Sequence, residues 1–261
     1  MLKSLFSPVY FAKPAAEPLD LLRKRLDQFG LVRVGGADGE WVSALDGSQA
    51  LVADISASDA SVGAEVSYAL HKCHIPVLCL RKRGVPAVRA IEASGHPLLT
   101  VCEYGDDADA ASAIDGFLTP PASPGRIFVV EGGDGAGKQT QTALLRERLT
   151  GMGYPVSTID FPHDAAMHGK LIRTLLSGAM GDIKSVNPLL FASLYAQNRY
   201  DVTPLLSFWL ARGDNVILDR YVEANFGHQV RSWPTELAYT RDCFVSGLLC
   251  KNQYHSLRTH P

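Results

Sequence analysis

Short apolar runs alternate with segments of helical spacing in the first part of the chain. Four runs predict strands, at residues 8–12, 50–55, 75–80 and 98–102. Between and after them, apolar positions recur with helical periodicity over 18–29, 63–72 and 108–118. Strands that alternate with helices are typical of a parallel sheet covered by helices on both faces.

The alternation stops at a proline-rich segment, TPPASPG at 119–125, and then starts again. Strands are expected at 126–131, 155–160 and 215–219, and helices at 139–152 and 189–209, with an interruption near Pro204. The pattern predicts an α/β fold of two three-layer units with parallel sheets. The first unit spans 1–118, the linker 119–125 and the second unit 126–261.

Composition narrows the possible partners. Lys plus Arg number 25 and Asp plus Glu 27, so the net charge of −2 argues against non-specific nucleic-acid binding. No apolar run is long enough to predict a membrane span, so neither nucleic acid nor membrane is an expected partner. Five cysteines without repeated spacing favour a reducing compartment. We expect a cytoplasmic protein, with an organelle as the alternative because of Lys3 and the serines beside it.

A glycine-rich loop between a predicted strand and a predicted helix has the P-loop spacing G-x-x-x-x-G-K. Its residues are Gly132, Gly133, Asp134, Gly135, Ala136, Gly137 and Lys138, and Gln139 and Thr140 begin the helix. Backbone N–H groups of such a loop surround phosphate oxygens, and the lysine adds a cation. Gln139 stands where a Ser or Thr usually binds Mg²⁺, so the loop predicts phosphate binding more securely than metal binding.

Several further motifs follow this loop in a fixed order. They are VVEGGDGAGKQTQ at 129–141, DFP at 160–162, GKLIR at 169–173, LYAQNR at 194–199, LDRY at 218–221 and HQ at 228–229. Together they resemble the thymidylate kinase family over residues 126–229. The resemblance implies transfer of the γ-phosphate of ATP to dTMP, or to a related deoxynucleoside monophosphate, with Mg²⁺, by a homodimer.

The resemblance also implies roles for individual residues. The catalytic group would be Lys138, Asp134, Asp219 and Arg220, with Asp219 close to the metal. The monophosphate would be bound by Phe161, Arg173, Tyr195, Arg199, Tyr221 and Gln229. Purely structural roles are an alternative for these residues, because Phe161 and Tyr195 suit a hydrophobic core equally well. Residues 219–221 also suit a local ion pair beside a packing tyrosine.

The resemblance ends near Gln229, and residues 230–261 do not match the family. The arginine-bearing lid and the later strand of the family are not recognisable there. Our hypothesis is an incomplete P-loop kinase domain, from a truncated or frame-shifted product. A nucleotide-binding remnant with impaired catalysis is therefore one alternative function.

The first unit resembles the nucleoside 2-deoxyribosyltransferase-like superfamily, and within it the 2′-deoxynucleoside 5′-phosphate N-hydrolases. The matching segments are VYFA at 9–12, DGEW at 38–41, LVADIS at 51–56, SVGAE at 61–65 and PVLCL at 76–80. The resemblance implies a flavodoxin-like fold. It also implies that Glu65 is a nucleophile toward the deoxyribose, positioned by Tyr10, with Asp38 and Asp54 as assisting acids. The alternative is that Glu65 is only a favourable charge at a helix N-terminus.

Phosphorylation of dTMP is the leading prediction for the whole chain. The alternative enzymatic prediction is cleavage of the glycosidic bond of a deoxynucleoside monophosphate by the first unit. The residues at 13–18 contain neither the arginine nor the paired glycines of that family's phosphate loop. The resemblance of the first unit therefore predicts its fold more strongly than its activity.

Overall fold

The computed structural model describes residues 2–12, 20–30, 32–34, 40–57, 59–133 and 135–221. The chain divides into two compact units, Met1–Ala122 and Ser123–Pro261, and the division falls inside the proline-rich segment 119–125. Both units are α/β folds built on parallel strands. In the described ranges, every helix is too short or too polar to cross a bilayer.

Unit 1 contains a five-stranded sheet of order β2-β1-β3-β4-β5, in which every neighbouring pair is parallel. This is the strand order of flavodoxin-like folds. The strands are β1 (Val9–Ala12), β2 (Val32–Val34), β3 (Ala50–Asp54), β4 (Val77–Lys82) and β5 (Leu99–Tyr104).

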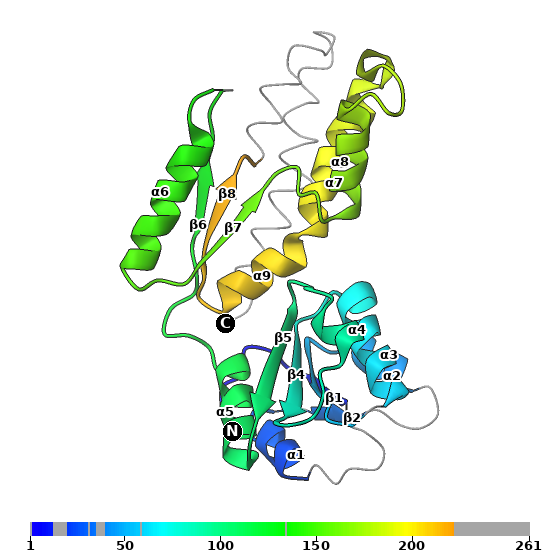
Figure 1. The fold of residues 1–261 in the computed structure, drawn as a ribbon, viewed down its shortest axis with the longest axis vertical. Helices are drawn as coiled ribbons and strands as arrows, with labels where there is room; N and C mark the ends of the chain where they lie inside the picture. Colours follow the sequence, from blue (N-terminus) through cyan, green and yellow to red (C-terminus); the bar gives the residue numbers. More distant parts are fainter. Residues whose placement is uncertain are drawn as a thin grey trace. The chain divides into compact units, whose positions relative to one another are not determined.

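Helices cover both faces of this sheet, as Figure 1 shows. One face carries α1 (Asp20–Asp27) and α5 (Asp107–Leu118). The other carries α2 (Trp41–Asp46), α3 (Ala60–Tyr68), which continues as a π-helical turn Ala69–Cys73, and α4 (Arg89–Glu92). Because the sheet is covered on both sides, β1 and β3 are buried along their whole length.

Two differences from the expected elements have local causes. Helix α3 begins at Ala60 rather than Gly63, because the Asp59 side chain accepts a hydrogen bond from the Ser61 N–H at 2.8 Å and caps the helix. The short elements β2, α2 and α4, of three, six and four residues, are absent from the predicted pattern. Elements of this length hold too few residues for a periodicity to appear.

Unit 2 contains a three-stranded parallel sheet of order β6-β8-β7. The strands are β6 (Ile127–Val130), β7 (Val156–Asp160) and β8 (Asn215–Asp219). In Figure 1, α6 (Lys138–Gly151) lies on one side of the sheet. The other side carries α7 (Met167–Leu176), a 3₁₀ turn (Ile183–Ser185), α8 (Pro188–Asp201) and α9 (Thr203–Ala211).

The helix expected over 189–209 is in fact two helices. Helix α8 ends at Asp201 and α9 begins at Thr203, so Pro204 lies in the first turn of a new helix. Proline is tolerated there because the first turn leaves its N–H groups without intrahelical acceptors. The predicted interruption is confirmed, but the chain breaks before the proline rather than at it.

The register of unit 2 brings three strand ends together. Asp219 at the end of β8 lies between Val130 of β6 and Asp160 of β7. Strand β8 is the central strand, and Val216, Ile217 and Leu218 are fully buried. Open α/β sheets bind ligands at the carboxyl ends of their strands. We therefore expect a ligand-binding site at the loops that follow β6, β7 and β8.

Candidate functional site

The loop after β6 has the geometry of a phosphate cradle. Gly135 and Gly137 have left-handed φ angles of 78° and 77°, which favour glycine. Lys138 is the first residue of α6 and is buried, and its Nζ donates to the carbonyl oxygens of Gly132 at 2.9 Å and Gly133 at 2.7 Å. A cation is thus held within the loop at a helix N-terminus, where phosphate oxygens bind in proteins.

The structure describes all of the other predicted residues of this loop except Asp134. Ala136 closes the turn by donating its N–H to the Gly133 carbonyl at 3.2 Å. Gln139 and Thr140 are exposed in the first turn of α6. Asp134 lies outside the described residues.

Tyr221 connects the loop after β6 with the residues after β7 and on α8. Its backbone N–H donates to Glu131 Oε1 at 2.5 Å, directly before the glycine loop. Its ring lies 5.6 Å from the ring of Phe161, centroid to centroid, at an interplanar angle of 55°. The guanidinium carbon of Arg199 lies 5.9 Å from the centroid of the same ring. The structure therefore brings together three of the predicted substrate-binding residues.

Arg199 is the most deeply buried cation of this group, with 2% of its surface exposed. Burial of a charge is costly unless other groups stabilise it, and the face of Tyr221 supplies one favourable contact. A guanidinium held in this way presents a rigid fork that matches two phosphate oxygens.

Tyr195 packs in the hydrophobic core, and its predicted contact with the substrate stays a prediction. Its ring meets Phe191 edge to face at 5.2 Å and packs on the hydrophobic cluster of Ile172, Leu175 and Leu194. Burial raises the pKa of Tyr195, while the positive charges of Arg173 and Arg220 act in the opposite direction. The ring thus belongs to the core of α7 and α8, and the two predicted arginines lie close to the same side chain.

Arg173 and Arg220 are held in different ways. Arg173 Nε donates to Asp164 Oδ1 at 2.8 Å, and both side chains of this pair are about half exposed. Arg220 follows β8 with a left-handed φ of 65°, and its N–H donates to the Val130 carbonyl at 3.0 Å. A non-glycine residue in this conformation is uncommon, and such strain concentrates at functional sites.

Asp219 suits a metal that is held mainly by a nucleotide. It is partly buried at the end of β8, and the register places Asp160 beside it. The described part of the chain contains no group of three His, Cys, Asp or Glu side chains that could hold a metal ion. Mg²⁺ needs no such cage, because one or two carboxylates, substrate phosphates and water complete its shell. The donor set therefore fits Mg²⁺ bound together with phosphates.

Unit 1 contains a separate pair of candidate residues, Glu65 and Tyr10. Glu65 lies in the second turn of α3 and is half-buried, and burial raises its pKa to about 7. The charge of Asp59 adds to this effect, whereas the nearby Tyr10 hydroxyl opposes it. Tyr10 is fully buried in β1, and burial together with the Glu65 carboxylate raises its pKa. The helix-dipole alternative for Glu65 is wrong, because its effect fades beyond the first turn of the helix.

The other residues predicted for unit 1 are placed less directly. Asp54 is almost fully buried and accepts hydrogen bonds from the Tyr104 hydroxyl at 2.7 Å and the Ser56 N–H at 2.9 Å. Asp38 lies outside the described residues, as does Gln229 of the second unit. The structure thus places Glu65 near Tyr10, whereas Asp54 is hydrogen-bonded to Tyr104.

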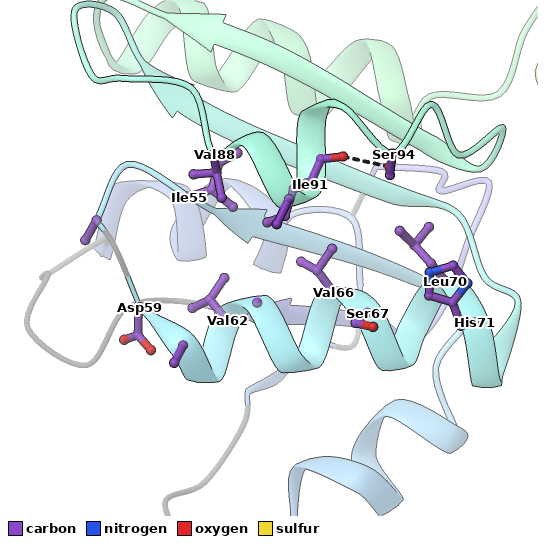
Figure 2. Close-up of a pocket in the computed structure, with 14 residues that line it drawn as sticks. Ile55, Asp59, Val62, Val66, Ser67, Leu70, His71, Val88, Ile91 and Ser94 are labelled. Atoms are coloured by element: carbon purple, nitrogen blue, oxygen red, sulfur yellow. Dashed lines mark hydrogen bonds between the residues drawn. The ribbon is translucent and has the colours of Figure 1, made fainter.

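A cavity of about 490 Å³ lies between α3 and α4, but Glu65 does not line it. Figure 2 shows Val62, Val66 and Ile91 directed into it from the two helices, and Leu70 from the π-helical turn that continues α3. Figure 2 also shows Asp59 near one end of α3 and His71 near the other. The cavity is therefore a mainly apolar space, and it does not include the predicted nucleophile.

Three residues that hold predicted site residues or the turn beside them were given no role of their own by the sequence. Glu131 holds Tyr221, Asp164 holds Arg173, and Asn198 holds the backbone of His163. Each lies inside or within two residues of a motif noted above, at 129–141, 160–162 and 194–199. The sequence shows that these residues lie in or near the motifs, but their hydrogen-bond partners depend on the fold.

Unit 2 has the features of a P-loop phosphate-binding fold, and comparisons with known proteins narrow this class. Residues 130–229 match the family model described as thymidylate kinase. The chain is similar to the thymidylate kinase of Leifsonia xyli, at 37% identity over 111 residues that cover 42% of this chain and 51% of that protein. It is also similar to the human thymidylate kinase, at 33% identity over 100 residues that cover 38% and 45%.

These similarities concern part of each protein. The chain spans about half the length of the curated relatives it matches. Among solved structures, a thymidylate kinase from Candida albicans matches with 22% identity and a TM-score of 0.39 over 49% of this chain and 58% of that one. The family model and the two sequence relatives show that the second unit contains a thymidylate kinase-like region.

Proposed function

We propose that unit 2 transfers the γ-phosphoryl group of ATP to dTMP, or to a related deoxynucleoside monophosphate, and releases ADP and dTDP. One observation carries the proposal. Tyr221 links Glu131, beside the phosphate loop, to the ring of Phe161 and the guanidinium of Arg199. A phosphate cradle and an aromatic–arginine cluster thus share one edge of the sheet, as a donor and an acceptor nucleotide require.

On the donor side, the glycine loop and Lys138 bind the phosphates of ATP. The loop N–H groups and the dipole of α6 stabilise the negative charge, and Lys138 exchanges its carbonyl partners for phosphate oxygens. Mg²⁺ neutralises charge on the transferring phosphate when it is bound with the nucleotide. Asp219 would hold it, with Asp160 beside it. Asp134 stays a predicted contributor.

On the acceptor side, aromatic rings bind the base and arginines bind the phosphate. Phe161 and Tyr221 form one wall, and Tyr195 lies among the arginines. Arg199 and Arg173 bind the 5′-phosphate, and Arg220 stabilises the transferring oxygens. Phosphoryl transfer needs little beyond this, because catalysis depends on alignment and on positive charge. A contact of Gln229 with the base stays a prediction.

The test is ADP formation by the full chain with ATP, Mg²⁺ and dTMP. We expect ADP to form only when dTMP is present. Lys138→Ala should lower the rate by about 100- to 1,000-fold, the range for loss of one preorganised charged group. Arg148→Ala is the matched control, because it removes a positive charge from the exposed end of the same helix.

Turnover, taken together with nucleotide binding, separates the kinase from the nucleotide-binding remnant. ATP and dTMP binding without turnover would favour the nucleotide-binding remnant over the kinase. Failure to bind dTMP would contradict the kinase, and failure to bind ATP as well would contradict the remnant. Sedimentation of the full chain at several concentrations tests the predicted homodimer independently of activity.

A second candidate function concerns unit 1, and the raised pKa of Glu65 favours it. A carboxyl group with a pKa of about 7 beside a buried tyrosine hydroxyl is poised to exchange a proton or to act as a nucleophile near neutral pH. We propose cleavage of the glycosidic bond of a deoxynucleoside monophosphate. Glu65, as a carboxylate, would form a bond to C1′ as the C1′–N bond breaks, and the base would leave with a proton from an assisting acid, Asp38 or Asp54. Water would then cleave the Glu65–C1′ bond and release the sugar phosphate.

Release of free base without ATP tests this second function. Glu65→Gln should abolish it, while Asp107→Asn, an exposed carboxylate in the first turn of α5, should not. Base release that survives Glu65→Gln would rule out Glu65 as the nucleophile.

A further inference from the structure

A fully buried asparagine on α8 grips the turn that follows β7. The His163 N–H donates to Asn198 Oδ1 at 2.7 Å, and Asn198 Nδ2 donates to the His163 carbonyl at 3.1 Å. One carboxamide thus satisfies both backbone groups of a single residue two positions beyond Phe161. Asn198 has no exposed surface, so water does not compete for these hydrogen bonds.

Helix α7 meets the same point. A Cβ atom on Gly169 would lie 1.8 Å from the His163 carbonyl oxygen and 2.9 Å from Asn198 Nδ2. No side chain fits at that distance, so this close approach of α7 requires glycine. The turn after β7, helix α7 and helix α8 therefore meet within one small, buried contact.

Each of these three elements carries a residue of the proposed acceptor site. The turn carries Phe161, α7 carries Arg173, and α8 carries Tyr195 and Arg199. We infer that Asn198 is a positioning residue for the monophosphate acceptor, because it fixes the aromatic wall relative to the arginines. This inference rests on the proposed kinase function of unit 2. Among the described residues, no atom of the phosphate loop takes part in the contact.

A second link should keep the two helices together when the first is removed. Asp201 Oδ2 accepts from the His168 N–H at 3.3 Å and lies 2.8 Å from His168 Nδ1. This pair joins the start of α7 to the end of α8, one helical turn from Asn198. Loss of the asparagine should therefore release the turn at His163 without detaching α7 from α8.

The experiment compares dTMP and ATP binding to the full chain by isothermal titration calorimetry. In Asn198→Ala, the two His163 backbone groups lose their partners, and the turn should shift. We expect the dissociation constant of dTMP to rise by at least about tenfold, while that of ATP changes by less than about threefold. Gly169→Ala attacks the contact from α7 and should give the same selective loss.

Asn187→Ala is the matched control, because it removes an asparagine from the same helix. Asn187 caps α8 at its exposed end, where its Oδ1 accepts from the Leu189 and Leu190 N–H groups. This variant should lower the melting temperature without changing dTMP affinity by more than about threefold.

The outcomes separate the inference from the proposed function. If the wild-type chain does not bind dTMP, both are overturned. If the wild type binds dTMP, and Asn198→Ala and Gly169→Ala bind it as tightly as the wild type does, only the positioning role is overturned. Equal loss of ATP and dTMP affinity would likewise overturn it, because the contact would then serve general stability alone.

Discussion

The two units place opposite charges on similar scaffolds. Both have parallel sheets with helices on each face, yet unit 2 gathers cations such as Lys138 and Arg199 near its carboxyl edge. The candidate residues of unit 1 are instead carboxyl groups: Asp54 accepts a hydrogen bond from the Tyr104 hydroxyl, and Glu65 lies near the hydroxyl of Tyr10. The fold provides the edge in both cases, whereas the residue types decide whether it suits a phosphate or carboxylate chemistry.

The largest expected effect tests whether the two units are separate folding units. Leu51 in β3 and Leu218 in β8 are both fully buried in the interior of their sheets. Replacement of either by alanine should lower the stability of its own unit by about 2 to 5 kcal/mol, through lost burial and a new cavity. Hydrogen exchange measured by mass spectrometry, on peptides from β3 and β8, follows each unit in the same sample.

The two variants act as controls for each other. Leu51→Ala should increase exchange in β3 and leave β8 and ATP binding unchanged, and Leu218→Ala should do the reverse. If either variant increased exchange in both sheets equally, the units would unfold together, and the comparison between them would lose its basis.

The next effect tests whether the cations of unit 2 are specific phosphate ligands. Arg199→Lys keeps the buried charge but replaces the planar fork with a single ammonium. We expect dTMP affinity to fall by about 10- to 100-fold, the range for loss of a hydrogen bond to a charged group. Binding measured by calorimetry with ATP and with dTMP separates the two nucleotides.

Arg212, the C-cap residue of α9, offers a matched control. Its guanidinium carbon lies 5.1 Å from the centroid of the Phe208 ring, so it makes the same kind of contact as Arg199 at an exposed position. Arg212→Lys should leave dTMP affinity unchanged. An equal loss in the two variants would mean that Arg199 supports the fold and does not bind the phosphate.

The phosphate loop and every strand except the three-residue β2 were predictable, because they depend on local sequence. Continuous apolar runs marked β3, β4 and β8, and the glycine spacing marked the loop before α6. The contacts of the site were not predictable in this way. Asn198 and His163 are 35 residues apart, and no periodicity relates them.

Local capping also altered the expected picture. Asp59 starts α3 three residues earlier than the hydrophobic pattern indicated. That shift moves Glu65 into the second turn and removes its explanation as a helix N-terminal charge. A side-chain cap one residue before the helix thus changes the interpretation of a residue six positions later.

The smallest expected effect tests the carboxyl group of unit 1. Burial raises the pKa of Glu65 from 4.5 to about 7, so the folded state binds its proton more tightly than the unfolded chain does. Stability should therefore be lost as the pH rises from about 4.5 to about 7. Glu65→Gln cannot ionise, so it should match the wild type at pH 5 and be more stable at pH 8.

The expected gain at pH 8 is about 1 kcal/mol. The full pKa difference corresponds to roughly 3 kcal/mol, and solvent screening at a half-exposed carboxylate reduces it. Thermal unfolding across this pH range measures the gain, with Asp107→Asn as the control that should show none. Tyr10→Phe sharpens the test, because it removes the hydroxyl that lowers the pKa of Glu65 and should extend the stability loss to higher pH. A Glu65→Gln gain that is the same at pH 5 and pH 8 would show that packing, and not ionisation, distinguishes this site from the cationic edge of unit 2.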